Sequence, residues 1–292
     1  NLRMWGVQGF DIAKTVSNIT KYAVLITDPK RVKYEFQKAI YLAESGRPGP
    51  VWIDIPTDIQ ATQIDPNELE SYVPEMENTK SEFGGLIKQI EDMLKIAQRP
   101  VFIFGNGVRL SGSEHLLPLL VDKFKIPFML AWNGIDMMPS QHPLNFGREG
   151  TYGQRCANFV VQNADLIITV GTRMAIPQIG YDYKEFGRDA KKVVVDIDRT
   201  ELDKFANDSS FLLIEANAST FLNEMVKNTN IPETDISEWV MRCNIWKNKY
   251  PFVEPNGMHK EQEGKLNSYS FVWELNKHFA QDEIVVCDMG TA

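Results

Sequence analysis

The chain has few of the residues that bind metals or form disulfides. Three cysteines and four histidines occur among 292 residues. They lie far apart in different segments: Cys156, Cys243, Cys287, His115, His142, His259 and His278. The cysteine spacing matches no metal motif, and an odd number leaves one thiol over, so reduced buried thiols are the plain interpretation. No histidine has a serine, cysteine or carboxylate at a telling spacing, and we therefore predict no metal site and no catalytic triad in this chain.

Long apolar runs and an excess of positive charge are also absent. No segment approaches the roughly 20 apolar residues of a membrane-spanning helix, and no basic and then apolar signal segment opens the chain. The net charge of −8 argues against a nucleic-acid partner, because domains that bind nucleic acid are usually basic. We therefore expect a cytoplasmic protein without a membrane or nucleic-acid partner, in which local arginines and backbone N–H groups could still bind an anionic cofactor.

What remains is the composition of a globular protein, 43% hydrophobic and 24% charged. The length predicts about two domains, each able to bury a core. The first residue is Asn1 rather than methionine, and the final string EIVVCDMGTA reads as a strand that stops where its following loop should begin. We therefore expect the chain to be part of a longer protein.

Short apolar runs alternate with helical segments through the middle of the chain. Runs of this kind, without polar alternation, are typical of strands covered on both faces: 101–104, 127–130, 166–170, 193–197 and 211–214. The helices expected between and after them are 114–124, 151–163, 200–205 and 218–227. This order predicts an α/β fold, a doubly wound parallel-sheet central domain flanked by parts of two further α/β domains.

Two polar stretches divide the chain into the expected domains. Before them lies an αβ unit, in which a helix over 29–45 is capped by Asp28 and followed by a short buried strand closed by Pro56. Trp239 and Trp246, in the second polar stretch, have the spacing of one helix face packed on a neighbour. The expected divisions are 1–60, a linker at 61–83, a central domain at 84–229, a connector at 230–267 and the start of a third unit at 268–292.

The carboxyl ends of two predicted strands carry candidate binding residues. In open parallel sheets ligands bind beyond these ends, which places Gly171, Thr172 and Arg173, together with Asp196 and Asp198, at a crevice. We favour Asp196 or Asp198 as a contact to a ribose hydroxyl or adenine amine, with the other capping the next helix, over catalysis by the pair.

Two glycine-containing loops add further candidates. Gly105, Asn106 and Gly107 follow a strand and would let a phosphate or ribose approach backbone N–H groups, with Ser111 or Ser113 capping the next helix. The third glycine of the dinucleotide fingerprint is missing, so a tight structural turn is an equal alternative.

Two arginines could bind an anion with their planar fork of donors. Arg148 stands in the loop Gly147-Arg148-Glu149-Gly150, and the alternative is a surface loop in which Arg148 pairs with Glu149. Arg173 follows a strand directly, and its alternative is a salt bridge with Asp182 or Asp198.

Five strings, in this order, resemble one enzyme family: SGRPGPVWIDIPTDIQ, FGNGVRLSG, NADLIITVGTR, VVVDIDRTEL and IVVCDMGTA. They are similar to the thiamine-diphosphate-dependent 2-oxo-acid enzymes, most closely acetolactate synthase and acetolactate-synthase-like proteins. The resemblance implies that residues 1–60 are the C-terminal part of a pyrimidine-binding domain, 84–229 a central FAD-binding-like domain and 268–292 the start of a diphosphate-binding domain. It also implies that the catalytic glutamate and the metal-binding motif of the family lie outside this chain.

The resemblance further implies thiamine diphosphate and magnesium as cofactors, with the magnesium ligands outside this chain, and FAD as a candidate cofactor of the central crevice. At one place the chain departs from the family pattern, because MAIPQIGYDYKEF follows Arg173 where the synthases carry a charged loop rich in Asp and Arg. The implied cofactor-binding residues are Gly105, Asn106, Gly107, Gly147, Arg148, Glu149, Gly150, Gly171, Thr172, Arg173, Asp196 and Ile197, with Gly290 and Thr291 touching the diphosphate of the thiamine cofactor.

The activity implied by the resemblance is decarboxylation of pyruvate or a related 2-oxo acid, followed by ligation of the resulting carbanion to an acceptor carbonyl. Active sites in this family lie between subunits, which implies a homodimer or homotetramer. Two alternatives stay open: a 2-oxo-acid decarboxylase or lyase of the same family, and, for this chain alone, a noncatalytic nucleotide-binding module.

Overall fold

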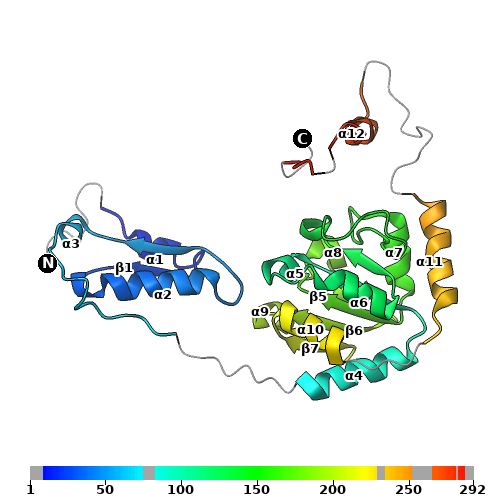
Figure 1. Ribbon diagram of the computed structural model, residues 1–292, viewed down its shortest axis with the longest axis horizontal. Coiled ribbons are helices and arrows are strands. Elements are labelled where there is room, and N and C mark those ends of the chain that lie inside the picture. The colour runs from blue at the N-terminus through cyan, green and yellow to red at the C-terminus, as the bar shows by residue number, and fades with distance from the viewer. Residues whose placement is uncertain (1–8, 75–82, 229–233, 252–264, 281, 287–292) are drawn as a thin grey trace.

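A five-stranded parallel sheet forms the centre of the computed structural model, which describes residues 9–74, 83–228, 234–251, 265–280 and 282–286 (Figure 1). The strand order is β4-β3-β5-β6-β7, and each neighbouring pair is parallel. The strands are β3 (Pro100–Phe104), β4 (Phe128–Leu130), β5 (Leu166–Val170), β6 (Lys191–Asp196) and β7 (Phe211–Glu215). The predicted α/β fold with a doubly wound parallel sheet is confirmed.

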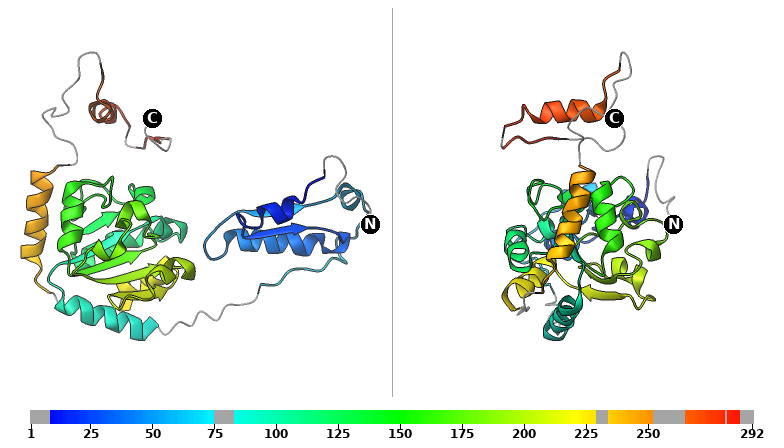
Figure 2. Two further views of the ribbon diagram at one scale, coloured as in Figure 1. Left: turned by 180° about the vertical axis from the view of Figure 1, so that it is seen from behind. Right: turned by 90° about the vertical axis from the view of Figure 1, so that its right-hand side faces the viewer.

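Helices cover both faces of this sheet (Figures 1 and 2). Successive strand residues point to opposite faces, so Phe102 and Phe104 join one core while Val101 and Ile103 join the other. The first core is completed by α4 (Phe83–Ile96), α6 (Leu116–Phe124) and α10 (Ala218–Asn228). The second is completed by α7 (Arg155–Asn163) and α11 (Ser237–Lys249).

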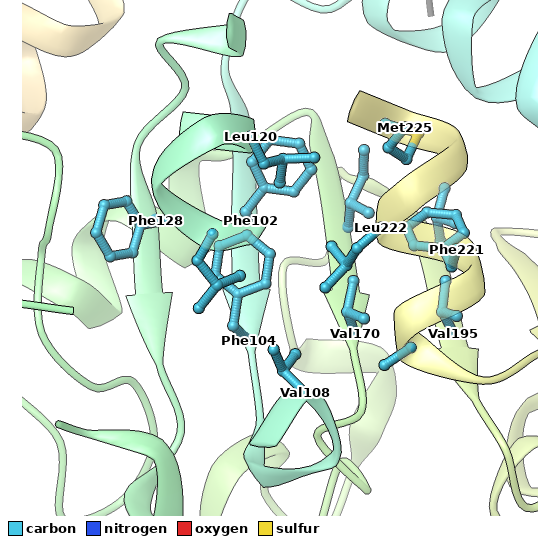
Figure 3. Packing of buried hydrophobic residues seen from close by; sticks show 14 of the residues in the cluster. Phe102, Phe104, Val108, Leu120, Phe128, Val170, Val195, Phe221, Leu222 and Met225 are labelled. Carbon is cyan, nitrogen blue, oxygen red and sulfur yellow. The ribbon is translucent and has the colours of Figure 1, made fainter. Parts of the chain in front are cut away.

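The first core is dense with aromatic rings (Figure 3). The rings of Phe102 and Phe104 stack with their centroids 5.5 Å apart, and Leu120, Phe221 and Leu222 belong to the same cluster with at most 1% of their surface exposed. Burial of each such side chain contributes roughly 1.5–3 kcal/mol. The strands are therefore held rigidly, and so are the loops that leave their carboxyl ends.

Helix α11 packs on this domain through two buried residues, Trp239 and Cys243. Trp239 donates a hydrogen bond from Nε1 to the Pro100 carbonyl at 3.1 Å, and only 4% of the residue is exposed. Its ring meets that of Trp246 edge-on at 5.9 Å, which confirms the predicted helix face. A helix inside the stretch 230–267, expected to be a connector, thus packs on the central sheet.

One helix start and one helix cap differ from the prediction. Helix α7 begins at Arg155 instead of residue 151, because the Gln154 amide donates to the Arg148 carbonyl at 2.8 Å and keeps the preceding residues in a turn. Helix α5 (Asn106–Leu110) begins directly after Gly105, and the hydroxyl of Ser113 donates to the Val108 carbonyl at 3.1 Å instead of capping α6. The capping role expected of Ser111 or Ser113 is therefore wrong.

The first unit pairs β1 (Tyr22–Leu25) with β2 (Val51–Asp54) in parallel, alongside α1 (Ile12–Val16) and α2 (Val32–Glu44). As predicted, Asp28 accepts a hydrogen bond from the Lys30 amide at 2.9 Å where this helical segment begins, here as a short 3-10 turn, Pro29–Arg31. The second strand, expected to be buried, is only partly so, because Trp52 is 41% exposed. Among the described residues β2 pairs with β1 alone.

The remaining elements are short or lie near the end of the chain. Short helical segments are α3 (Thr57–Gln60), α8 (Ile176–Ile179), α9 (Arg199–Leu202) and the 3-10 turns Trp132–Gly134, Tyr183–Glu185 and Asp203–Phe205. Helix α12 (Ser268–Asn276) follows. Ile284 to Val286, expected to open a final strand, are not in a strand, and the rest of that expected strand lies outside the described residues. Within the described ranges no helix is both long and apolar enough to cross a membrane.

Candidate functional site

The tips of β3 and β5 meet at the point where the strand order reverses. From β3 the chain moves to β4 on one side, and β5 lies on the other side of β3. The Gly105 amide donates to the Val170 carbonyl at 2.9 Å, and the Gly107 amide donates to the Gly171 carbonyl at 3.0 Å. Ligands of open α/β sheets bind at such a reversal, so the predicted loops stand at the expected place.

At Gly105, Gly107 and Gly171 the backbones pack too closely to leave space for a side chain. A Cβ on Gly105 would lie 2.2 Å from the Gly171 carbonyl oxygen, and one on Gly107 would lie 2.7 Å from the Gly171 Cα. Gly171 itself has φ of +60°, a region that favours glycine. The tight structural turn that was the alternative for Gly105, Asn106 and Gly107 therefore accounts for both glycines of that motif.

The two aspartates after β6 have different environments. Asp198 caps α9, since its Oδ1 accepts hydrogen bonds from the Thr200 amide at 3.0 Å and the Thr200 hydroxyl at 2.6 Å. Those bonds, the hydroxyl one above all, lower the pKa of Asp198. Asp196 accepts from the Asp198 amide at 2.9 Å, and burial raises its pKa. Asp198 is thus a helix cap, and Asp196 is a partly buried carboxyl group at the end of β6.

Asp196 lines a cavity of about 180 Å³ at the carboxyl ends of the strands. This volume is below the roughly 300–1,000 Å³ of sites for drug-sized ligands, so the cavity has room for one end of a nucleotide. Residues 44 and 46–48 of the first unit form part of its wall. The central domain contributes Gly107, Leu110, Ser111, Gly171, Val195, Asp196, Ile197, Ala216, Asn217 and Ala218.

The loop Gly147-Arg148-Glu149-Gly150 is not the surface loop that was one alternative. Glu149 is 1% exposed and accepts a hydrogen bond from Gln178 Nε2, while its Oε2 is buried and has no partner among the described residues. Burial raises the pKa of Glu149 and lowers that of Arg148. A buried carboxyl oxygen without a partner is costly, and such a group calls for a proton or a further ligand.

Glycine and asparagine hold this loop in place. Gly150 has φ of +109°, and a Cβ there would lie 2.4 Å from the Pro177 carbonyl oxygen. The side chain of Asn158 binds both sides of the same residue, accepting from the Gly150 amide at 2.8 Å and donating to its carbonyl at 3.0 Å. The loop is thereby hydrogen-bonded to α7 and packed closely against α8.

The turn after β5 is strained. Arg173 and Met174 adopt φ of +59° and +51°, a region that costs a non-glycine residue of order 1–2 kcal/mol. Arg173 Nε binds Glu201 at 2.8 Å, so neither Asp182 nor Asp198, the expected alternatives, is its partner. The Thr172 hydroxyl is buried and has no hydrogen-bond partner within the described ranges.

Sequence reasoning missed four residues of this region: Arg47, Gln178, Glu201 and Asn217. Arg47 binds Glu201 at 2.9 Å and Asp198 at 3.2 Å across two units of the chain. The Gly-Arg-Pro-Gly turn that carries Arg47 was a recognisable signal, and Glu201 stands inside the string VVVDIDRTEL, whereas Gln178 belongs to none of the five strings. Gly290 and Thr291 lie outside the described residues, and within those residues no group of three or more His, Cys, Asp or Glu side chains could hold a metal ion.

Residues 87–225 match the family model described as "Thiamine pyrophosphate enzyme, central domain". This central domain of the chain therefore belongs to the family of thiamine pyrophosphate enzymes, as the motif order predicted.

Its curated relatives include acetolactate synthase large subunits. That of Lactococcus lactis subsp. lactis is 27% identical over 98% of this chain and 49% of its own length. A probable large subunit of Methanococcus aeolicus is 30% identical over 93% of this chain and 47% of its own length. The large subunit of Escherichia coli isozyme 1 is 33% identical over 71% of this chain and 36% of its own length. The chain therefore spans at most about half the length of these relatives.

Proposed function

We propose that this chain is the central part of an acetolactate-synthase-like enzyme. The reaction is decarboxylation of pyruvate or a related 2-oxo acid, followed by ligation of the resulting carbanion to an acceptor carbonyl. The observation that carries the proposal is the match of the central domain to the thiamine pyrophosphate enzymes, extended over 98% of the chain by similarity to an acetolactate synthase large subunit.

Thiamine diphosphate, when bound, supplies the electron sink for the decarboxylation. This chain's own candidates for its diphosphate, Gly290 and Thr291, lie outside the described residues. We place the magnesium ligands outside this chain. The described residues would contribute the central sheet and the loops at its strand ends.

FAD is the second proposed cofactor, and part of the crevice fits one end of it. The cavity of about 180 Å³ offers the Asp196 carboxylate as an acceptor for a ribose hydroxyl. The Thr172 hydroxyl and Glu149 Oε2 are buried polar atoms without a hydrogen-bond partner among the described residues, and each could accept one from a ligand. In this arrangement Asp196 would hold the ribose end, while the loop Gly147–Gly150 and Thr172 would meet a more distant part of the nucleotide.

A carbon dioxide release assay tests the reaction. The full-length protein is incubated with pyruvate, with and without added thiamine diphosphate and magnesium, and the products are identified. Acetolactate is expected. Free acetaldehyde would instead indicate a decarboxylase or lyase, and no thiamine-diphosphate-dependent release from any 2-oxo acid would contradict the proposed reaction.

An absorbance spectrum between about 350 and 500 nm tests the flavin site separately, with the released cofactor identified after denaturation. Near-stoichiometric flavin is expected in the purified protein, and Asp196→Asn is expected to lower the flavin content. Asp208→Asn is the matched control, because Asp208 caps a different turn through Ser210. A colourless protein would remove FAD from the proposal and leave the fold unchanged.

The proposed enzyme is a homodimer or homotetramer, with each active site shared between subunits. Light scattering coupled to size exclusion gives the mass of the full-length protein in solution. A monomer that retains full activity would contradict this part of the proposal.

A further inference from the structure

One side chain links the first unit of the chain to the central domain at the edge of the crevice. Arg47 follows α2, and its Nη1 lies 2.9 Å from Glu201 Oε1 and 3.2 Å from Asp198 Oδ2, on and beside α9. The sequence separations are 154 and 151 residues, so these contacts join segments that the polar stretch at 61–83 separates along the chain. In Figure 1 the loop between α2 and β2 faces the side of the central domain that carries α5 and α9.

The loop that carries Arg47 is rigid within its own unit. Lys21 Nζ donates to the Ser45 carbonyl at 2.6 Å, and the Gly49 amide donates to the Ala43 carbonyl at 3.0 Å. Gly46 adopts φ of +57°, which turns the chain sharply at the end of α2. Because the loop cannot move freely against its unit, a contact made by Arg47 fixes the position of the whole unit.

The acceptor on the central domain is equally well anchored. Glu201 is 13% exposed in its side chain and also binds Arg173 at 2.8 Å and Lys204 at 2.5 Å. Asp198 is held as the cap of α9 by its bonds from Thr200. Arg47 therefore docks onto two carboxylates that are already in place, and this lowers the side-chain entropy lost on forming the contact.

The same contact completes the wall of the crevice. Residues 44 and 46–48 line the cavity opposite Gly107, Gly171 and Asp196. The wall on that side is present only while the first unit stays against the central domain.

We propose that Arg47 is a positioning residue, an ionic tether that holds the first unit closed over the crevice through Glu201 and Asp198. Exposed ion pairs contribute about 0.2–1 kcal/mol each. Loss of two such pairs is therefore expected to shift the ratio of open to closed chains about two- to thirtyfold toward open. This inference concerns the chain without ligand and does not depend on the proposed reaction or on flavin.

Small-angle X-ray scattering of the whole 292-residue chain tests the tether. Arg47→Glu places a like charge against Glu201 and Asp198, and it is expected to raise the radius of gyration and broaden the distance distribution. Arg47→Lys keeps the charge and is expected to remain close to the parent chain. Arg188→Glu is the matched control, because Arg188 is an exposed arginine whose ion pair, with Glu185, is local.

Scattering of the parent chain at increasing salt concentration tests the tether without any substitution. At about 1 M NaCl the Debye length falls to about 3 Å, and the parent chain is expected to expand as Arg47→Glu does at low salt. Arg47→Glu itself is expected to change little with salt. An unchanged radius of gyration for Arg47→Glu at low salt, with circular dichroism showing a folded chain, would overturn the tether, and so would an equal expansion of Arg188→Glu.

Discussion

The amide of Gly107 donates a hydrogen bond to the carbonyl of Gly171 at 3.0 Å, and this contact locks the tip of β3 to the tip of β5. The two residues come from different motifs of the sequence. Each is glycine because the other backbone lies where a Cβ would be, at 2.7 Å in both directions. The crevice of the central domain is therefore built on backbone contact between its two glycine turns.

Substitution at this contact is expected to destabilise the fold. Gly105→Ala would place a Cβ 2.2 Å from a backbone oxygen, and overpacking of this kind costs about 1–3 kcal/mol of unfolding free energy. Urea denaturation monitored by circular dichroism measures the loss. The control is Gly85→Ala in α4, where a Cβ meets nothing within 4 Å and helix propensity favours alanine by about 1 kcal/mol. Equal midpoints for Gly105→Ala and the parent chain would contradict the prediction.

The buried carboxyl of Glu149 is expected to make stability depend on pH. Burial raises its pKa in the folded chain, so above the ordinary glutamate range the unfolded chain releases its proton while the folded chain keeps it. This group therefore lowers stability as pH rises, by up to about 1.4 kcal/mol per pH unit, until the raised pKa is passed.

Glu149→Gln replaces the titratable carboxyl by an amide that cannot ionise and keeps the shape of the side chain. We expect the variant to lie closest to the parent chain at about pH 4, where Glu149 keeps its proton in most unfolded chains too, and to be the more stable of the two at about pH 8, in the same urea experiment. A difference in stability that stays constant with pH would show that Glu149 does not titrate in this range.

The indole of Trp239 is expected to contribute more to stability than that of Trp246. Trp239→Phe removes the donor to the Pro100 carbonyl and leaves a buried acceptor unpaired, which costs about 1–3 kcal/mol. Trp246→Phe removes an indole that is only partly buried and has no recorded N–H partner within the described ranges, so it is the matched control. Thermal or urea unfolding of the two variants compares them directly, and equal losses would contradict a role for the hydrogen bond.

Much of the fold could be predicted because short apolar runs without polar alternation are compatible with few structures besides buried strands. The run 166–170 coincides with β5, and the runs over 101–104 and 127–130 differ from β3 and β4 by one residue at the start. Helix starts were less predictable. Helix α7 begins four residues later than expected because the Arg148 carbonyl binds the Gln154 amide, a loop contact with no sequence signature.

The strand tips that carry the candidate residues were predictable, but their electrostatics were not. Strand tips follow from the strands, so Gly171 and Asp196 could be named in advance. The partner of Arg173 could not, because Glu201 is one of several acidic residues at reachable spacing and only the packing of α9 brings it to 2.8 Å.

The sequence by itself determined the class of the fold, the position of the crevice and the family, since these depend on local hydrophobic pattern and on motif order. Tertiary structure alone decided that Glu149 is buried, that Gly105 and Gly107 pack on Gly171, and that Arg47 reaches across to Glu201. The physical reason is the same in each case. Burial, close contact and charge pairing depend on which distant segments meet, and the local sequence carries no record of that.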